Sequence, residues 1–281
     1  MKKTIIFSIL IALTFGLFGQ ENNSLKYKEF TKFKLTDGNT YLGTILEEND
    51  DYVTIRTEAF AELKITKSSI VSREIITGDK LNKGEYWFEN PNATRNLFGP
   101  TGYGLRKGEG YYQNFLLFYN SVSYGFTDNI TVGVGLIPFS FGDGLFYTIT
   151  PKVSFPIKED KFNIGAGVLI AGVGSENVGI AYGVATVGSR DKNFSIGLGY
   201  GFNDGELADQ PTITVSGMLR LAKKFGLVTE NWIIDGEALF TLSGRLIFEA
   251  ISVDIGFANT SGSGIFPGFP LAGITVPFGR K

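Results

Sequence analysis

In the stretch Phe194-Ser195-Ile196-Gly197-Leu198-Gly199-Tyr200-Gly201-Phe202-Asn203, large apolar residues occupy every second position and small or polar residues lie between them. Successive side chains of a β-strand point to opposite faces, so this pattern predicts a strand with one apolar face and one small or polar face. The same alternation recurs at 130–136 and 162–170. A soluble sandwich would bury the apolar face in a core, whereas a membrane barrel would turn it toward lipid.

The composition excludes several classes of chemistry. The chain has 281 residues, with 37 glycines and neither cysteine nor histidine. Disulfides and thiolate ligands are therefore excluded, and the commonest general base and metal ligand is missing. The net charge of −2 lacks the basic excess that nucleic-acid binding requires. We predict that the chain is not an enzyme, and we expect no catalytic residues, no metal site, no cofactor and no nucleic-acid partner.

The first 19 residues have the pattern of an export signal. Lys2 and Lys3 precede an apolar run at 5–18, and polar residues follow at 20–24. The run is at or below the length needed to span a bilayer, so residues 1–19 predict a cleaved signal peptide rather than an anchor helix. No later stretch is apolar for long enough to form a spanning helix, so a membrane location would require a barrel.

Residues 30–77 differ from the rest of the chain. Turn signals at Asp37-Gly38 and at 49–51 separate short runs rich in β-branched residues. These runs predict strands at 30–35, 40–47, 52–57, 61–65 and 71–76. The stretch Leu35–Ile45 resembles the opening hairpin of small SH3-like and Sm-like barrels. The resemblance implies a small β-module, which we expect in the periplasm as a plug, spacer or docking piece, followed by a connector at 78–95.

Residues 96–281 continue the alternating pattern and predict an antiparallel transmembrane β-barrel. About twelve strands are expected, an even number as in bacterial single-chain barrels, with ten as the alternative because Pro100 cannot donate a ladder hydrogen bond in the first. The expected strands cover 94–105, 111–125, 129–139, 144–155, 161–172, 176–188, 193–203, 211–222, 226–235, 239–248, 251–259 and 269–278. Inward glycines, such as Gly133, Gly135, Gly165 and Gly167, would let aromatic neighbours lie over bare backbone.

A few charged residues occur inside these strands and are the candidate functional residues. Arg220, Arg245 and Asp254 share faces with small polar residues and therefore point into the barrel. A tight hairpin near Glu249 would place Arg245 directly opposite Asp254. Glu230 shares its face with apolar residues, so a bulge or register shift is expected to turn it inward.

Together these residues predict a ladder of alternating sign in the barrel interior. The ladder runs Arg220–Glu230–Arg245–Asp254, with Glu249 at one rim and Lys152 on the far wall. It has two interpretations. An ion-paired interior would fill a narrow barrel, since small barrels are normally filled by side chains, whereas an open constriction would select small polar or charged solutes.

The whole chain resembles uncharacterised outer-membrane β-barrel proteins of diderm bacteria, with a leader, a small module and a barrel in that order. The last strand, with Phe278 near its end, is similar to the signal read by barrel-assembly machinery, although residues 279–281 follow it. The resemblance implies an outer-membrane location, with outer-membrane lipid and the assembly machinery as partners.

Three functions remain open on the sequence. In the first, the barrel passes or binds small solutes or stiffens the membrane. In the second, the barrel anchors the module at 30–77, which docks a periplasmic partner protein. In the third, the chain is a secreted soluble barrel that binds lipid in an internal cavity. The strands at 161–172 and 193–203 have no charged residue in their middles, which favours a membrane barrel over a soluble one.

Overall fold

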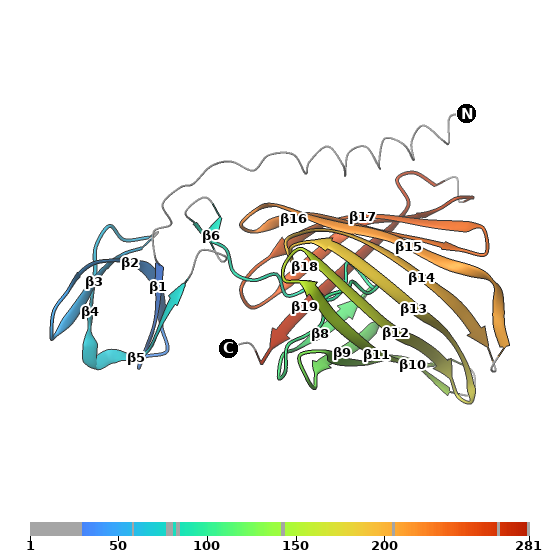
Figure 1. The fold of residues 1–281 in the computed structure, drawn as a ribbon, viewed down its shortest axis with the longest axis horizontal. Helices are drawn as coiled ribbons and strands as arrows, with labels where there is room; N and C mark the ends of the chain where they lie inside the picture. The colour runs from blue at the N-terminus through green and yellow to red at the C-terminus, as the bar shows by residue number, and fades with distance from the viewer. Residues whose placement is uncertain are drawn as a thin grey trace. The chain divides into compact units, whose positions relative to one another are not determined.

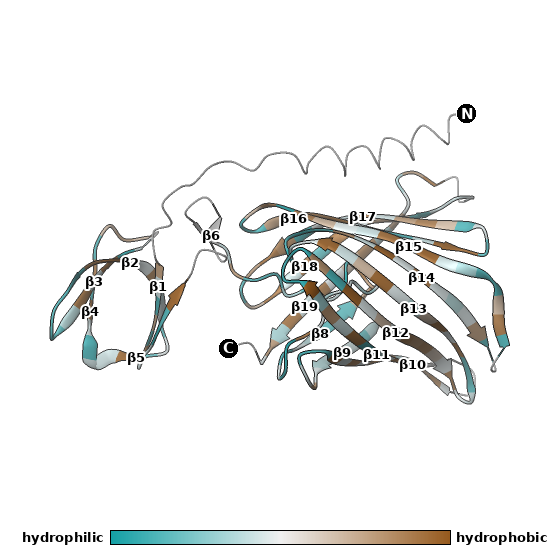
Figure 2. Cartoon of the chain, viewed as in Figure 1, coloured by the Kyte–Doolittle hydropathy of each residue, from teal (hydrophilic) through white to brown (hydrophobic). Residues whose placement is uncertain are grey.

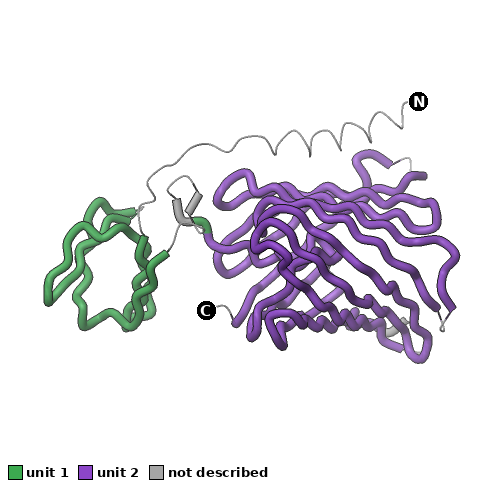
Figure 3. Tube along the Cα trace, in the orientation of Figure 1, with its two compact units in different colours: residues 1–87 green, residues 88–281 purple. Residues whose placement is uncertain are grey.

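The computed structural model describes residues 30–57, 59–76, 81–82, 85–141, 144–203, 206–262 and 265–279. The predicted signal peptide at 1–19 lies outside the described residues. The chain divides into two compact units, Met1–Trp87 and Phe88–Lys281, each taken by itself below (Figure 3). Within the described residues, no helix has both the length and the apolar character needed to cross a membrane.

The first unit contains a five-stranded antiparallel sheet in the order β4-β3-β2-β1-β5. Its elements are β1 (Phe30–Leu35), β2 (Thr40–Glu48), β3 (Tyr52–Arg56), β4 (Leu63–Thr66), the 3-10 turn η1 (Lys67–Ser69) and β5 (Ile70–Ile76). Phe33, Val53 and Ile55 are fully buried and form its core with Leu35 and Ile65. The five strands predicted at 30–77 are thereby confirmed. A short pair, β6 (Leu81–Asn82) with β7 (Glu85–Tyr86), follows.

The second unit is a closed antiparallel barrel of twelve strands (Figure 1). The strands are β8 (Gly110–Phe115), β9 (Tyr119–Gly125), β10 (Ile130–Phe141), β11 (Gly144–Lys158), β12 (Phe162–Val173), β13 (Glu176–Gly188), β14 (Lys192–Asn203), β15 (Glu206–Ala222), β16 (Phe225–Ile234), β17 (Glu237–Ile247), β18 (Ser252–Thr260) and β19 (Phe269–Phe278). Each pairs with its neighbour in sequence, and β19 pairs with β8. The predicted twelve-stranded antiparallel barrel is confirmed.

The count of twelve is right, but two of the predicted strands are wrong. Residues 94–105 do not form a strand of the barrel. The strand expected at 111–125 is instead two strands, β8 and β9, joined by a tight turn in which Leu116 and Leu117 adopt positive φ angles of 53° and 67°. The turn consists of leucine and phenylalanine and carries none of the residues that usually mark a hairpin. The sequence therefore carries no sign of a turn here, and it predicts one strand in place of two.

The exterior of the barrel is apolar. Outward residues of the strands, such as Val134, Leu198 and Ile255, expose about half of their surface or more, and apolar positions recur along every long strand in Figure 2. Exposed aromatic residues lie toward both ends of the barrel. We call the end of the barrel at which β8 begins and β19 ends the terminal end. The exposed aromatic residues near the terminal end are Phe126, Phe155, Phe225, Phe248 and Phe278. Those toward the opposite end are Phe118, Phe139, Tyr200, Phe240 and Phe269. Aromatic girdles on both sides of an apolar band are typical of transmembrane barrels.

Candidate functional site in the barrel lumen

Residues Phe88–Arg106, which we call the inner loop, lie within the ring of barrel strands. Most of the loop is buried, including Asn92, Arg95, Leu97 and Thr101. It turns back on itself through a bridge between Arg95 and Pro100. The amide of Asn96 donates to the carbonyl of Gly99 at its tip. The connector predicted at 78–95 and the barrel predicted at 96–281 therefore do not match the division between the compact units, which falls after Trp87.

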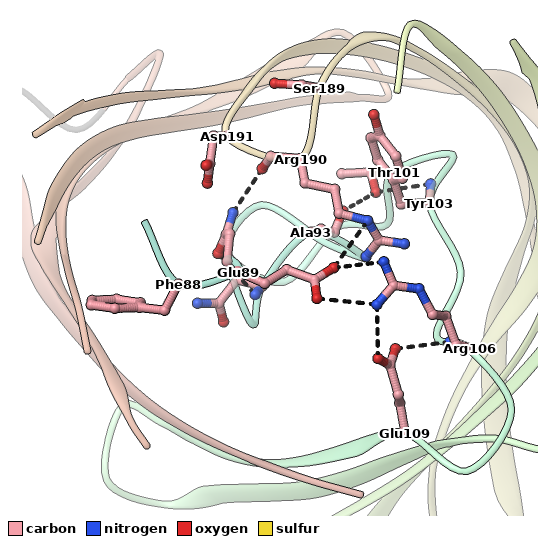
Figure 4. Close-up of polar contacts among 12 residues, drawn as sticks. Phe88, Glu89, Ala93, Thr101, Tyr103, Arg106, Glu109, Ser189, Arg190 and Asp191 are labelled. Carbon is pink, nitrogen blue, oxygen red and sulfur yellow. Dashed lines mark hydrogen bonds and ion pairs between the residues drawn. The ribbon is translucent and has the colours of Figure 1, made fainter. Parts of the chain in front are cut away.

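Both ends of the inner loop lie at the terminal end of the barrel, where ion pairs join them. Glu89 lies between Arg106, at 3.0 Å, and Arg190 of the β13–β14 turn, at 3.4 Å (Figure 4). Arg106 also pairs with Glu109. Burial lowers the pKa of Arg106, but its hydrogen bonds with Glu89 and the charges of both carboxylates outweigh this and raise it. The loop thus enters and leaves the lumen through the same mouth.

Glu230 of β16 holds the tip of the inner loop. Its carboxylate accepts hydrogen bonds from the backbone amides of Leu97, Phe98 and Gly99 at 2.8–3.3 Å, and from the indole of Trp232 at 2.9 Å. Consecutive amides that converge on a carboxylate form a cradle for negative charge. The register of β15 with β16 places Glu230 opposite Ser216 and Arg220 opposite Gly226, so the two residues expected to lie near each other are at different levels of the wall.

The bulge or shift expected at Glu230 does not occur. Glu230 lies opposite Ser216 in an unshifted register with β15. The face that it shares with Val228 and Trp232 points inward, and Val228 is buried opposite Met218 and Ser243. The polar residue Asn231 faces outward and donates to the carbonyl of Val215. The sequence argument failed because it assumed that apolar residues face lipid.

Arg245 of β17 and Asp254 of β18 are directly opposite each other in the register. The guanidinium makes two hydrogen bonds to the carboxylate, at 2.6 and 3.0 Å, and both side chains are almost completely buried. Arg245 also donates to the carbonyl of Asn96 in the inner loop. The pair therefore has two roles: it satisfies two buried charges and fixes one side of the loop tip.

The other predicted charges lie apart from this pair. Arg220 of β15 donates to the carbonyl of Phe88 and pairs with Asp191 at 3.0 Å. Burial raises the pKa of the Asp191 carboxyl, against the opposing charge of Arg220. Lys152 of β11 donates to three carbonyls of the inner loop, and Glu249 is exposed in the β17–β18 turn at the rim. The ladder of alternating sign is therefore replaced by separate contacts between wall and loop.

Neutral side chains complete the attachment of the loop to the wall. Asn92 donates to Ser252, Asn96 donates to Ser216, and the backbone amides of Gly102 and Leu105 donate to Thr186 and Thr131. The four wall residues belong to β18, β15, β13 and β10, and each lies on the small or polar face of its strand. The polar interior predicted from the alternation thus binds a segment of the same chain.

Inward glycines make room for tyrosine rings, as the alternation predicts. A Cβ added at Gly135 would lie 2.7 Å from the ring of Tyr119, and one added at Gly167 would lie 2.7 Å from the hydroxyl of Tyr182. A cavity of about 70 Å³ remains between the loop and the wall from β8 to β13. Among the described residues, no group of three or more acidic, histidine or cysteine side chains is placed to hold a metal ion.

Sequence reasoning missed the inner loop as the main occupant of the lumen. The missing signal was compositional: Asn90, Asn92 and Asn96 occur within seven positions, followed by glycines at 99, 102 and 104, with no sustained apolar alternation. Clusters of asparagine, glycine and proline indicate irregular backbone rather than a strand.

Replacing Gly102 by alanine is expected to displace the inner loop. A Cβ at this position would lie 2.7 Å from the carbonyl carbon of Asn163 and still closer to its oxygen, and neither backbone can yield. We expect a loss of about 1–3 kcal/mol in stability, as for other overpacked sites, measured as the urea midpoint of the folded band on unheated gels. Gly183→Ala is the control, because nothing lies within 4 Å of the added atom. Equal midpoints for the two variants would contradict the packing of the loop.

Comparisons with known proteins give similarity in fold only. No protein-family model matches the chain, and no curated protein matches it. Similar solved structures are outer-membrane barrels. The KdgM porin is 10% identical, with a TM-score of 0.47 over 62% of this chain and 99% of the porin. The NanC porin is 11% identical, with a TM-score of 0.40 over 62% and 98%.

A loop-deletion mutant of OmpT, an outer membrane protein of Vibrio cholerae, is 12% identical, with a TM-score of 0.33 over 89% of this chain and 96% of that one. All three TM-scores are below 0.5, so these similarities assign no function to this chain.

Proposed function

We propose that this protein is an outer-membrane β-barrel whose lumen is closed by its own inner loop, and that the barrel serves as a membrane anchor rather than as an open pore. The observation that carries this proposal is the attachment of residues 88–106 to the interior wall. Side chains of β8, β10, β11, β13, β15, β16, β17, β18 and β19 form hydrogen bonds with the loop.

The energetics support a closed resting state. Withdrawal of the loop would remove the three backbone amides that donate to Glu230 and the three carbonyls that accept from Lys152. Each hydrogen bond to a charged group contributes roughly 1.5–3 kcal/mol relative to hydration by water. A few such contacts are enough to hold the open state at a very small population.

The exterior of the barrel supports a place in the membrane. Its outward residues are apolar and its interior is polar, which is the arrangement of a transmembrane barrel. A secreted soluble lipid binder requires the opposite arrangement, with an apolar cavity and a charged exterior. The proposed anchor would hold the module at 30–77 at the membrane, and the docking of a periplasmic partner protein by that module stays a prediction.

The first test is the conductance of the mature protein in a planar bilayer. We expect no discrete conductance steps from the wild-type barrel at moderate voltage, because the loop fills the lumen. The folded state is checked in the same sample by the shift in gel mobility between heated and unheated protein. Discrete steps from folded wild-type protein would contradict the closed-lumen proposal.

Passage of small solutes after movement of the loop is the second candidate. It is favoured by one observation: the loop enters and leaves through the same mouth, so it can withdraw without threading through the barrel. Conductance that appears only when contacts of the loop tip are weakened would favour this candidate over a permanently closed anchor.

A further inference from the structure

The cavity beside the inner loop is lined by two basic side chains. Arg95 from the loop and Lys152 from β11 both line it, and the described residues that line it include no carboxylate. Both cations are more than nine-tenths buried. A buried charge without a counter-charge is costly, so a site of this kind favours an anion.

The described residues satisfy only part of the Arg95 guanidinium. Its Nε donates to Gln113 at 2.8 Å, its Nη2 donates to Thr275 at 2.7 Å, and its guanidinium lies 4.2 Å from the ring centre of Tyr111. Its Nη1 is buried and has no hydrogen-bond partner among the described residues. Buried polar groups are nearly always paired, so the Arg95 guanidinium has hydrogen-bonding capacity that the described residues do not use.

Lys152 supplies charge without a free donor. Its ammonium group donates to the carbonyls of Thr94, Thr101 and Tyr103 at 2.9, 3.2 and 2.6 Å. These carbonyls satisfy its hydrogen bonds but do not neutralise its charge. The acids of the lumen that face the loop tip are engaged elsewhere, Glu230 by backbone amides and Asp254 by Arg245.

We propose that this cavity binds a small oxyanion, such as inorganic phosphate or a carboxylate. The guanidinium of Arg95, which lines the cavity, would donate to an oxygen of the anion, as guanidinium groups do to carboxylate and phosphate. Tyr119, Ser121 and Ser123 line the same space, and the hydroxyl groups of the two serines can donate as well. A volume of about 70 Å³ is several times the roughly 10–15 Å³ that one water needs, which suits an ion of a few heavy atoms.

The test is calorimetric titration of phosphate into the detergent-solubilised full chain at low, constant ionic strength, with acetate as a parallel arm. We expect saturable binding of one anion per chain, and Arg95→Gln is expected to weaken it by about tenfold or more, because a charge-assisted hydrogen bond is lost. Arg56→Gln is the matched control, since Arg56 is an exposed residue of the first unit. Tighter binding of phosphate than of acetate, or the reverse, identifies which oxyanion geometry fits.

A second variant keeps the test decisive where Arg95→Gln disturbs folding. Ser123→Leu places a larger side chain in the cavity while leaving Arg95 and Lys152 unchanged, and we expect it to abolish binding in a barrel that keeps its heat-dependent gel shift. Three results would overturn the site: no binding by the wild type, equal binding by folded Arg95→Gln, or full affinity in Ser123→Leu. The site does not depend on the lumen being closed to ions, so a conducting wild type would leave this test unchanged.

Discussion

Glu230→Gln is expected to release the tip of the inner loop and to lower the stability of the barrel by about 3 kcal/mol. The carboxylate accepts hydrogen bonds on both oxygens, and in glutamine one of these acceptors becomes an NH₂ group that faces backbone donors. The urea midpoint can be followed through the fluorescence of Trp232, whose indole donates to the same carboxylate. In a planar bilayer the variant is expected to show conductance steps that the wild type lacks.

Glu206→Gln is the matched control for this substitution. Glu206 is exposed at the start of β15, so its loss of charge is expected to change neither the urea midpoint nor the conductance. An unchanged midpoint in Glu230→Gln would mean that the amides of the loop tip do not depend on the carboxylate. A lower midpoint without conductance steps would favour the permanent anchor over movement of the loop.

Asp254→Lys is expected to be the most damaging single substitution, with a loss of about 3–5 kcal/mol or more. It leaves Arg245, which is 0% exposed, without its counter-charge and adds a second cation beside it. The loss is measured as the temperature at which the folded band on unheated gels converts to the unfolded band. We expect that temperature to fall sharply, or the folded band to be absent.

The double variant Asp254→Lys with Arg245→Glu is expected to recover part of this loss, because the opposite charges again face each other across the same register. Recovery is incomplete because glutamate cannot donate to the carbonyl of Asn96 as Arg245 does. Asp209→Lys, on the exposed part of β15, is the control for charge reversal alone. A double variant no more stable than Asp254→Lys would show that the two residues do not act as a pair.

The faces of the barrel strands were predictable because they follow from local alternation. The side-chain period of a strand is two, so one correct assignment of a face fixes every other position on it. Predicting that Arg245 lies opposite Asp254 also required only the length of the hairpin and the alternation of faces along each strand. Parity alone misled at Glu230, where Val228 and Trp232 face the barrel interior instead of lipid. Apolar residues mark a buried face, and in this barrel the loop makes part of the interior a buried face too.

The inner loop could not be placed from the sequence because its conformation depends on distant partners. Its contacts reach residues more than 100 positions away, as between Asn92 and Ser252 or Arg245 and Asn96. Arg220 and Lys152 bind backbone carbonyls of the loop. Every residue has such a carbonyl, so the sequence carries no signal of which one is used. The sequence therefore predicted that these charged side chains point into the barrel, but it did not predict which groups they bind.

Arg95 contacts both strands that complete the barrel: Gln113 belongs to β8 and Thr275 to β19, the first and last strands of the ring. During biogenesis β19 is the last strand to be synthesised, and the loop is made before β8. Seating of the loop and closure of the ring therefore stabilise each other. Arg95 has three contacts in the wall, with Gln113, Thr275 and the ring of Tyr111. A chain whose final strand is missing or mispaired loses the contact with Thr275. We therefore expect incomplete barrels to expose the loop and to be cleaved by proteases.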